Sequence, residues 1–351
     1  MAGDKRRVAV VLFNLGGPDS PDAVRSFLFN LFNDPAIISL PGPARWLLAQ
    51  YISRRRTKLA QNNYALIGGG SPLLANTMKQ ANALQAALDG EDEIKCFISM
   101  RYWHPFSDET VSDVKAFQPD HVILLPLYPQ FAAATTGSSI SDWNRATARA
   151  GLDVPTRAIC CYPVDSGFIS SMAELTIEAW KKAEAVGNPR ILFSAHGLPK
   201  REIERGDPYQ WQIEQTAAAI ASAVSKKLGS VQEWLVSYQS RVGRLEWLGP
   251  YTDAEIERAG HEKRPLVIVP LAFVSEHVET LVELDIEYRE LADEYGVPAY
   301  ERVPTVSEHP DFIDGLAEMV RLAIKSDDQV QCGQGLGKCP ADKSRCPCIE
   351  R

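Results

Sequence analysis

Residues 272–290, AFVSEHVETLVELDIEYRE, carry five glutamates spaced three or four residues apart, directly after the apolar run PLVIVPL. On an α-helix, which advances about 100° per residue, these carboxylates fall within a sector of about 80°. Like charges at this spacing repel each other, and the segment from Pro265 to Tyr288 contains no lysine or arginine to offset them. The sequence therefore raises the question of what chemistry requires a row of uncompensated carboxylates. The glutamates are Glu276, Glu279, Glu283, Glu287 and Glu290.

Apolar residues border this acidic strip on both sides. A solvated helix face usually mixes charges of both signs and lies opposite a single apolar stripe. We therefore expect the carboxylates to line a channel into the fold, with a surface helix as the alternative. Such a channel can conduct cations inward or protons outward, because crowded carboxylates have pKa values that are pushed apart. The bordering residues are Leu281, Leu284, Tyr288 and Leu291 on one side and Val278, Val282 and Ile286 on the other.

Two histidines lie where they can join these carboxylates at a metal site. His277 stands between Glu276 and Glu279, and His196 follows the predicted strand 190–195 in the motif SAHGLP. A histidine at a strand end is often only a hydrogen-bonded structural residue, but the loop after His196 contains little that is apolar enough to bury its ring. We expect these groups to hold a divalent metal loosely and to exchange protons.

Four cysteines form the pattern C-x6-C-x6-C-x-C in a polar, glycine-rich tail. Without a recognisable secretory signal, the chain is expected in the cytoplasm, where thiols stay reduced or bind metal. The number of thiols favours a metal site. The spacing matches neither common zinc knuckles nor ferredoxin patterns, so zinc, an iron–sulfur cluster and free thiols all stay open. The tail cysteines are Cys332, Cys339, Cys346 and Cys348, and the strand-end Cys160 and Cys161 are further candidate ligands.

Short apolar runs alternate with helix-length amphipathic segments along the chain. Near-continuous apolar strands separated by helices indicate parallel sheets covered on both faces. We therefore predict an α/β fold of two doubly wound, Rossmann-like lobes, 1–160 and 161–325, followed by the tail 326–351. The predicted strands are 7–15, 95–101, 121–128, 157–162, 190–195, 233–238, 266–273 and 298–303, and the predicted helices include 74–89, 169–186, 210–228 and 310–325.

Ligands of such sheets bind beyond the carboxyl ends of the strands. The first strand ends in NLGGP (14–18), a tight turn that lacks the glycine pattern of a nucleotide loop. Later strands end in RYWHP (101–105), YPQFAAATTGSS (128–139) and QSRVGRLEWLGP (239–250). Together they indicate a large, aromatic cleft, acid-lined on one side, that suits a flat hydrophobic ligand and a cation.

Residues 25–56 interrupt the alternation with an apolar, proline-punctuated stretch that ends in Arg54, Arg55 and Arg56. A pair of core helices fits this composition, and so does a hydrophobic flap over an apolar ligand or a membrane surface. In the second case the arginines lie near ligand carboxylates or lipid head groups.

The overall composition bears on the class of function. The 351 residues are 45% hydrophobic and carry a net charge of −8, which indicates a globular protein and argues against nucleic acid as the main partner. No apolar run reaches the length of about 18 residues that would indicate a membrane span.

Eight motifs, in order from about residue 8 to residue 325, make the sequence similar to the ferrochelatase family. They are NLGGPDS, RRT, YALIGGGSPL, RYWHP, LYPQF…TTGSS, FSAHGLP…RGDPY, YQSRVGRLEWLGPYTD and AFVSEHVETLVELDIEY. The resemblance implies two Rossmann-like lobes around a porphyrin cleft. It also implies a lyase that inserts Fe²⁺ into protoporphyrin IX, with release of two protons, in haem biosynthesis. A coproporphyrin ferrochelatase, a cobalt or nickel chelatase and a non-catalytic tetrapyrrole or metal carrier are the alternatives.

The resemblance also implies roles for single residues. By motif position, His196 and Glu279 form the metal-insertion pair, and His277 is a further catalytic residue. Glu276, Glu283 and Glu287 line the acidic path. The porphyrin-binding set, in which Arg55 and Arg56 approach the propionates, is Leu15, Arg55, Arg56, Tyr64, Arg101, Tyr128 and Trp247.

The tail departs from the animal members of the family. They place one cluster cysteine in the small-residue loop, where this chain has Ala133. Because some bacterial members carry a [2Fe–2S] cluster on such a tail, the resemblance implies that cluster here, held by the four tail cysteines or by three of them with Cys161. The apolar stretch 25–42, which would form the lip of the cleft, resembles that of protoporphyrin-using members more than that of members acting on coproporphyrin. The implied partners are porphyrin and ferrous iron, with a peripheral contact to the inner membrane and a homodimer as further expectations.

Overall fold

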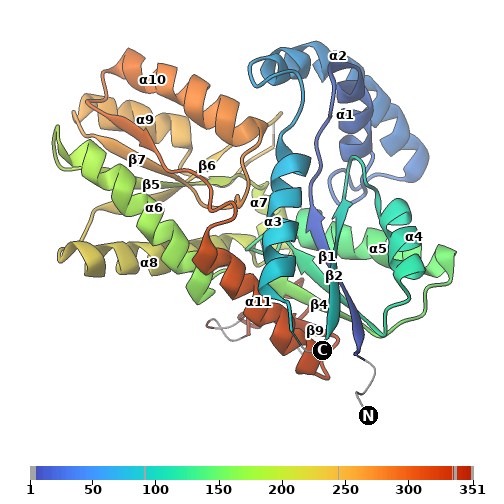
Figure 1. The fold of residues 1–351 in the computed structure, drawn as a ribbon. Coiled ribbons are helices and arrows are strands. Elements are labelled where there is room, and N and C mark those ends of the chain that lie inside the picture. The colour runs from blue at the N-terminus through green and yellow to red at the C-terminus, as the bar shows by residue number, and fades with distance from the viewer. Residues whose placement is uncertain (1–4, 91, 244, 334, 336–337, 349–351) are drawn as a thin grey trace. The chain divides into compact units, whose positions relative to one another are not determined.

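The computed structural model describes residues 5–90, 92–243, 245–333, 335 and 338–348. The chain forms two compact units, each with its own parallel sheet (Figure 1). Unit 1 consists of Met1–Cys161 with Leu316–Cys332, and unit 2 of Tyr162–Gly315 with Gly333–Arg351. The predicted α/β fold class with parallel sheets is confirmed.

Unit 1 is built on a five-stranded parallel sheet in the order β2-β1-β3-β4-β9. Val8, Val10 and Leu12 alternate along β1 with Ala9, Val11 and Phe13, and all six are at most 1% exposed. Burial of both sets shows that both faces of the sheet are covered. The strands are β1 (Arg7–Asn14), β2 (Glu93–Met100), β3 (His121–Pro126), β4 (Thr156–Cys161) and β9 (Val330–Cys332).

The helices of unit 1 differ in how much of their surface they bury. Val111 and Val114 of α4 and Trp143 of α5 pack into the core of the sheet. Within residues 25–56, α1 buries Phe27 and Leu28, whereas α2 exposes Trp46 and Leu47, so a core position describes α1 but not the outer face of α2. The helical segments are η1 (Pro21–Ala23), α1 (Val24–Phe32), α2 (Gly42–Ala65), α3 (Leu73–Ala87), α4 (Ser107–Phe117), η2 (Ala133–Gly137) and α5 (Ser138–Ala150).

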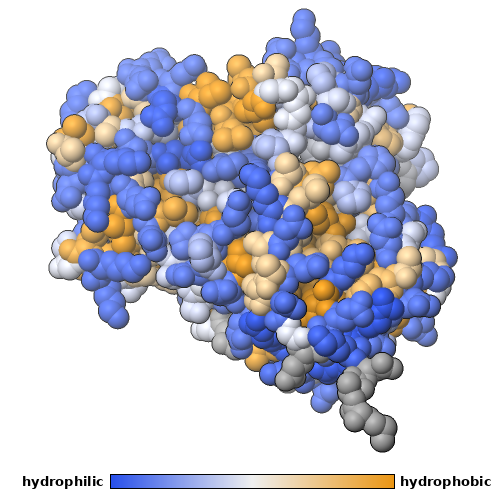
Figure 2. All heavy atoms as spheres, in the orientation of Figure 1, coloured by the Kyte–Doolittle hydropathy of each residue, from blue (hydrophilic) through white to orange (hydrophobic). Residues whose placement is uncertain are grey.

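Unit 2 is built on a four-stranded parallel sheet in the order β6-β5-β7-β8. Helices α9 and α10 lie on one face of this sheet, and α6 and α8 lie on the other (Figure 1). Figure 2 shows mainly hydrophilic side chains on the visible surface, with smaller hydrophobic groups between them. The elements are α6 (Ser166–Glu184), β5 (Arg190–His196), α7 (Lys200–Glu204), α8 (Tyr209–Leu228), β6 (Trp234–Gln239), α9 (Thr252–His261), β7 (Leu266–Pro270), η3 (Glu279–Glu287), α10 (Tyr288–Tyr295) and β8 (Tyr300–Arg302).

The C-terminal part of the chain differs from the prediction. Helix α11 (Pro310–Lys325) begins in unit 2 and ends in unit 1. Residues 316–325, which were predicted to belong to the second lobe, are therefore part of unit 1. The tail also supplies β9, which pairs in parallel with β4 in the sheet of unit 1. A half-buried strand of three residues is too short to produce a hydrophobic period, which explains why the sequence pattern did not reveal it.

Candidate active site

His196 ends strand β5, so its ring stands at the carboxyl edge of the sheet of unit 2. Its Nδ1 lies 3.0 Å from Oε2 of Glu279, the first residue of η3. Tyr209, at the start of α8, donates its hydroxyl hydrogen to the backbone oxygen of His196 over 2.9 Å. The structure thus brings together the two residues predicted as the insertion pair and holds the histidine by its backbone.

Each member of this pair changes the pKa of the other. Burial favours the neutral imidazole, but the charge and hydrogen bond of Glu279 outweigh it and raise the pKa of His196. Burial likewise raises the pKa of the Glu279 carboxyl, but His196 and His277 outweigh this effect and hold that pKa well below its usual range. The pair thus favours the charged form of each member, the Glu279 carboxylate and the His196 imidazolium.

His277 is buried beside the same carboxylate, and its contacts determine its orientation. Its Nδ1 lies 3.1 Å from the backbone oxygen of Ser275, which only accepts, so the hydrogen is assigned to Nδ1. The ring packs against Phe273 at a centroid distance of 4.5 Å. Its Nε2 then faces Oε2 of Glu279 at 3.8 Å. Glu279 therefore lies between two imidazoles.

Glu283, further along η3, is surrounded by hydrogen-bond donors. Its carboxylate accepts from the Ser240 backbone nitrogen over 2.9 Å, from the Ser240 hydroxyl and from the Tyr288 hydroxyl over 3.1 Å. Burial and the negative charge of Glu279 raise the pKa of Glu283. Two neighbouring carboxyls thus differ in proton affinity, which is the arrangement expected of a proton relay.

The segment that carries these carboxylates is a π-helix, whereas the sequence analysis assumed α-helical geometry. A π-helix closes i→i+5 hydrogen bonds, is rare and often occurs at functional sites. A π-helical turn contains more than four residues, so carboxylates four residues apart, such as Glu279 and Glu283, still lie on neighbouring turns of one face. Exposure increases along the series, since Glu279 and Glu283 are partly buried and Glu287 is exposed.

Glu276 has a different environment from the other carboxylates predicted for the acidic path. It accepts from Nη1 of Arg302 over 2.6 Å and from the backbone nitrogen of Thr305 over 3.0 Å. The sequence analysis missed Arg302, because it looked for compensating charge only within 265–288. The predicted strand 298–303 contains this arginine, and a search of the neighbouring strands for positive charge would have found it.

Trp247 lies beside the turn that follows His196. It forms an isolated antiparallel bridge with Pro199. Its ring is so close to Gly197 that a β-carbon there would come within 3.2 Å of it. The indole Nε1 donates to the backbone oxygen of Val242 over 3.0 Å. This predicted porphyrin contact therefore belongs to the same side of unit 2 as His196.

Arg101, predicted to contact porphyrin, lies in unit 1 just after β2. Its guanidinium bonds to the Asp34 carboxylate at 2.9 Å and to the Ser138 hydroxyl at 2.7 Å. Asp34 is only 3% exposed and also accepts from the Tyr102 hydroxyl over 2.7 Å. The sequence analysis did not single out Asp34, because an aspartate directly before a proline resembles an ordinary turn residue.

The remaining predicted porphyrin contacts are also in unit 1. The backbone oxygen of Leu15 accepts from the Tyr102 nitrogen over 2.9 Å, so Leu15 adjoins the Arg101 loop. Tyr64 is buried on α2, and Tyr128 packs against the core after β3. Arg55 is exposed, whereas the Arg56 guanidinium lies 5.8 Å from the centre of the Phe32 ring.

Cysteine sulfurs gather at the end of the sheet of unit 1. The Sγ atoms of Cys160, Cys161 and Cys332 lie within 4.8 Å of one another, a spacing that allows a shared metal. No disulfide joins any of the seven cysteines, all of which the structure describes. In unit 2, Cys339 and Cys346 are buried and Cys348 is half-buried.

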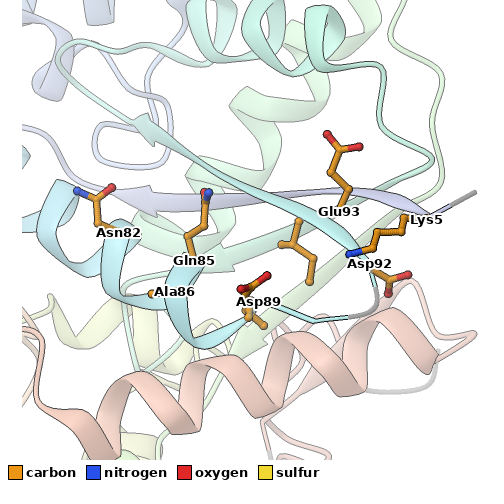
Figure 3. Close-up of a pocket in the computed structure, with 9 residues that line it drawn as sticks. Lys5, Asn82, Gln85, Ala86, Asp89, Asp92 and Glu93 are labelled. Atoms are coloured by element: carbon orange, nitrogen blue, oxygen red, sulfur yellow. The ribbon is translucent and has the colours of Figure 1, made fainter.

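A separate pocket of about 750 Å³ lies in unit 1 near the amino ends of β1 and β2 (Figure 3). Its lining includes Lys5, Gln85, Asp89 and Glu93. This is the end of the sheet opposite to the one where ligands of doubly wound sheets bind. Polar and charged side chains make up most of its lining, so it does not resemble the aromatic, apolar cleft that the sequence predicts.

The model of the ferrochelatase family matches residues 7–324. The chain belongs to the ferrochelatase family. It is 54% identical over 349 residues to the ferrochelatase of Caulobacter vibrioides, with 98% of each chain covered. It is 51% identical over 345 residues to that of Phenylobacterium zucineum, covering 97% of this chain and 98% of the relative. The predicted family, the enzyme class and the activity of iron insertion into a porphyrin are confirmed.

Solved structures with similar folds include SirB from Bacillus subtilis with Fe³⁺, with a TM-score of 0.54, 12% identity and coverage of 91% of this chain and 95% of that one. The sirohydrochlorin chelatase SirB from Bacillus subtilis subspecies spizizenii in complex with cobalt gives a TM-score of 0.51 at 10% identity, covering 91% and 96%. At such identities the likeness supports the fold alone. None of the helices that the structure describes combines the length and the apolar character that a membrane span requires.

Proposed function

We propose that the chain inserts Fe²⁺ into protoporphyrin IX to form protohaem, with His196 and Glu279 at the insertion site. The observation that carries this proposal is the 3.0 Å contact between His196 Nδ1 and Glu279 Oε2 at the carboxyl edge of β5. The edge position is where ligands of such sheets bind. The two side chains also combine a proton acceptor with an anion that attracts a metal cation.

The chemistry requires the porphyrin to lose two inner protons as iron enters. His196 accepts a porphyrin proton when its imidazole is neutral, and its raised pKa makes it a stronger base. Glu283 has a raised pKa as well and borders a pocket of about 160 Å³ with Ser240 and Tyr288. Protons then pass along η3 from the partly buried Glu283 to the exposed Glu287.

The choice of protoporphyrin over coproporphyrin rests on helix α2. Its first turns expose Trp46, Leu47 and Tyr51, with exposed fractions of 48%, 64% and 61%. An apolar lip of this kind suits the apolar edge of protoporphyrin better than the additional carboxylates of coproporphyrin. Arg55 and Arg56, further along α2, are the proposed partners of the two propionates.

An anaerobic assay with Fe²⁺ and either porphyrin, followed by the metalloporphyrin spectrum, tests the function. We expect the higher kcat/KM with protoporphyrin IX. A preference for coproporphyrin would refute the substrate assignment. Porphyrin binding without any metal insertion would instead support the carrier alternative, and a preference for Co²⁺ or Ni²⁺ would support a different chelatase.

The exposed side chains of α2 also support a peripheral contact with a membrane. Apolar and aromatic side chains followed by arginines resemble an interfacial helix. Flotation with anionic vesicles tests this contact, and replacement of Trp46 and Leu47 by Ser should abolish it. The expected homodimer is tested separately by light scattering of the purified full-length protein, where a monomeric mass at all concentrations would contradict it.

We also propose a [2Fe–2S] cluster held by Cys332, Cys339, Cys346 and Cys348, with Cys161 as the alternative fourth ligand. Four thiolates are the usual ligand set of such a one-electron centre. The proximity of the Cys161 and Cys332 sulfurs in unit 1 supports the alternative. Iron, sulfide and zinc analysis of anaerobically purified protein, with its visible spectrum, distinguishes cluster from zinc. C161S and C348S identify the fourth ligand, with C96S as the control.

A further inference from the structure

Arg302 of β8 joins two carboxylates that lie on either side of Glu279 in the sequence. Its Nη1 donates to Glu276 over 2.6 Å, and its Nε and Nη2 donate to the two oxygens of Asp285 over 2.7 and 2.5 Å. A guanidinium that binds a carboxylate through two parallel bonds fixes orientation as well as charge. The Arg302 side chain is 11% exposed, so little water competes for these bonds.

These contacts attach the π-helix η3 to the edge of the sheet. Glu276 precedes η3, and Asp285 lies inside it. Tyr300, two residues before Arg302 and therefore on the same face of β8, donates its hydroxyl hydrogen to the Leu284 backbone oxygen over 2.7 Å. Side chains of β8 thus hold the segment both before and after the position of Glu279.

A π-helix of this length needs such support. Most π-helical segments are single turns within an α-helix, whereas η3 has nine residues. If the segment relaxed to α-helical hydrogen bonding, the direction of Glu279 relative to Asp285 would change. Loss of the guanidinium would also leave the negative charges of Glu276 and Asp285 uncompensated by Arg302, close to the carboxylate that faces His196.

We propose that Arg302 is a positioning residue for metal insertion, which holds η3 in its π-helical register and thereby aims Glu279 at His196. The inference rests on the proposed roles of His196 and Glu279. Arg302 acts through Glu276 and Asp285.

The test compares R302Q, R302K, D285N and the double variant R302Q/D285N in the full-length protein. Arg289 supplies a matched control, because its guanidinium connects α10 to the Tyr300 backbone oxygen at 2.9 Å, whereas Glu276 and Asp285 bind Arg302. For each variant, kcat and KM for Fe²⁺ are measured at saturating porphyrin. Porphyrin affinity is measured by fluorescence without metal, and folding by circular dichroism and thermal melting.

We expect R302Q to lower kcat/KM for Fe²⁺ by about tenfold or more, with porphyrin affinity changed less than about twofold. R302K should recover part of the loss, because a single ammonium reaches one carboxylate. The double variant should be about as active as R302Q, since both changes remove the same contact. R289Q should stay within about twofold of the parent.

Three outcomes would overturn the proposal. The first is a folded R302Q with parental kcat/KM. The second is a double variant whose loss of kcat/KM is the product of the losses in R302Q and D285N. The third is a loss of porphyrin affinity in R302Q as large as its loss of kcat/KM. If R302Q does not fold, R302K and D285N serve as the test instead. Parental kcat/KM values for both of these variants would also overturn the proposal. E279Q separates this proposal from the proposed function: an active E279Q refutes the insertion site itself, whereas an inactive E279Q with an active R302Q refutes only the role of Arg302.

Discussion

Two carboxylates, one in each unit, are held by partners of different chemistry. In unit 1, Asp34 bonds to the Arg101 guanidinium and to the Tyr102 hydroxyl. In unit 2, Glu279 bonds to the His196 imidazole. A guanidinium keeps its proton at any ordinary pH, whereas an imidazole exchanges one near neutrality. The first arrangement fixes a side chain in place, and the second is able to move a proton.

The same contrast recurs within unit 2 along a single stretch of chain. Glu276 and Asp285 are bound by Arg302, while Glu279 lies beside histidines and Glu283 beside hydroxyl groups. The acidic residues of this segment therefore divide into two groups. Glu276 and Asp285 anchor the segment, whereas at the insertion site Glu279 stays ionised and the raised pKa of Glu283 lets that carboxyl bind a proton. Residue type alone does not separate these roles, because the partner decides whether a carboxylate is locked or free to exchange protons.

The largest effect is expected when the imidazole is removed. H196A should lower turnover by about a thousandfold or more, because the proton acceptor is lost. Porphyrin affinity, measured by fluorescence, should change little. H261A is the matched control, since this histidine lies on the exposed side of α9. Turnover of H196A near the parental rate would remove His196 from the mechanism.

The next effect concerns the partner carboxylate. E279Q should lower kcat by about a hundredfold, because the metal loses an anionic partner and His196 loses the charge that raises its pKa. His196 must be neutral to accept a proton, so the acidic limb of the pH profile lies at its pKa. That limb should therefore move to lower pH in E279Q. An unchanged limb would show that another group sets it; E290Q on the exposed side of α10 is the control.

A smaller effect on turnover, but a larger effect on stability, is expected for Asp34, the carboxylate bound by the Arg101 guanidinium. D34N should lower the free energy of unfolding by about 2 kcal/mol, because charged hydrogen bonds to the Arg101 guanidinium become weaker ones. The KM for porphyrin should rise a few-fold while kcat stays within about threefold. Denaturant unfolding of D34N is compared with that of D113N, an exposed aspartate of α4. Equal stability of the two variants would contradict the anchoring role.

Sequence reasoning was most successful where the physical signal was periodic. All eight predicted strands are present, and strands such as β1, β3, β5 and β7 were evident because buried parallel strands have continuous apolar runs. The pairing of His196 with Glu279 followed from strand-end position and family motifs. Arg302 was missed because it lies outside the segment whose charge it balances, and Asp34 because an aspartate before a proline resembles an ordinary turn residue. The π-helix was missed because an acidic spacing of three and four residues suits α-helical geometry as well.

The smallest effect is expected at the exposed end of the acidic series. E287Q should raise the KM for Fe²⁺ about twofold at low ionic strength, because one exposed charge attracts cations only weakly. The difference should disappear in about 0.5 M salt, where the screening length is only a few ångströms. E294Q, on the exposed surface of α10, should have no effect under either condition. A twofold change that persists in high salt would mean that Glu287 binds iron or transfers a proton itself. The carboxylates that take part in the reaction would then extend to the surface.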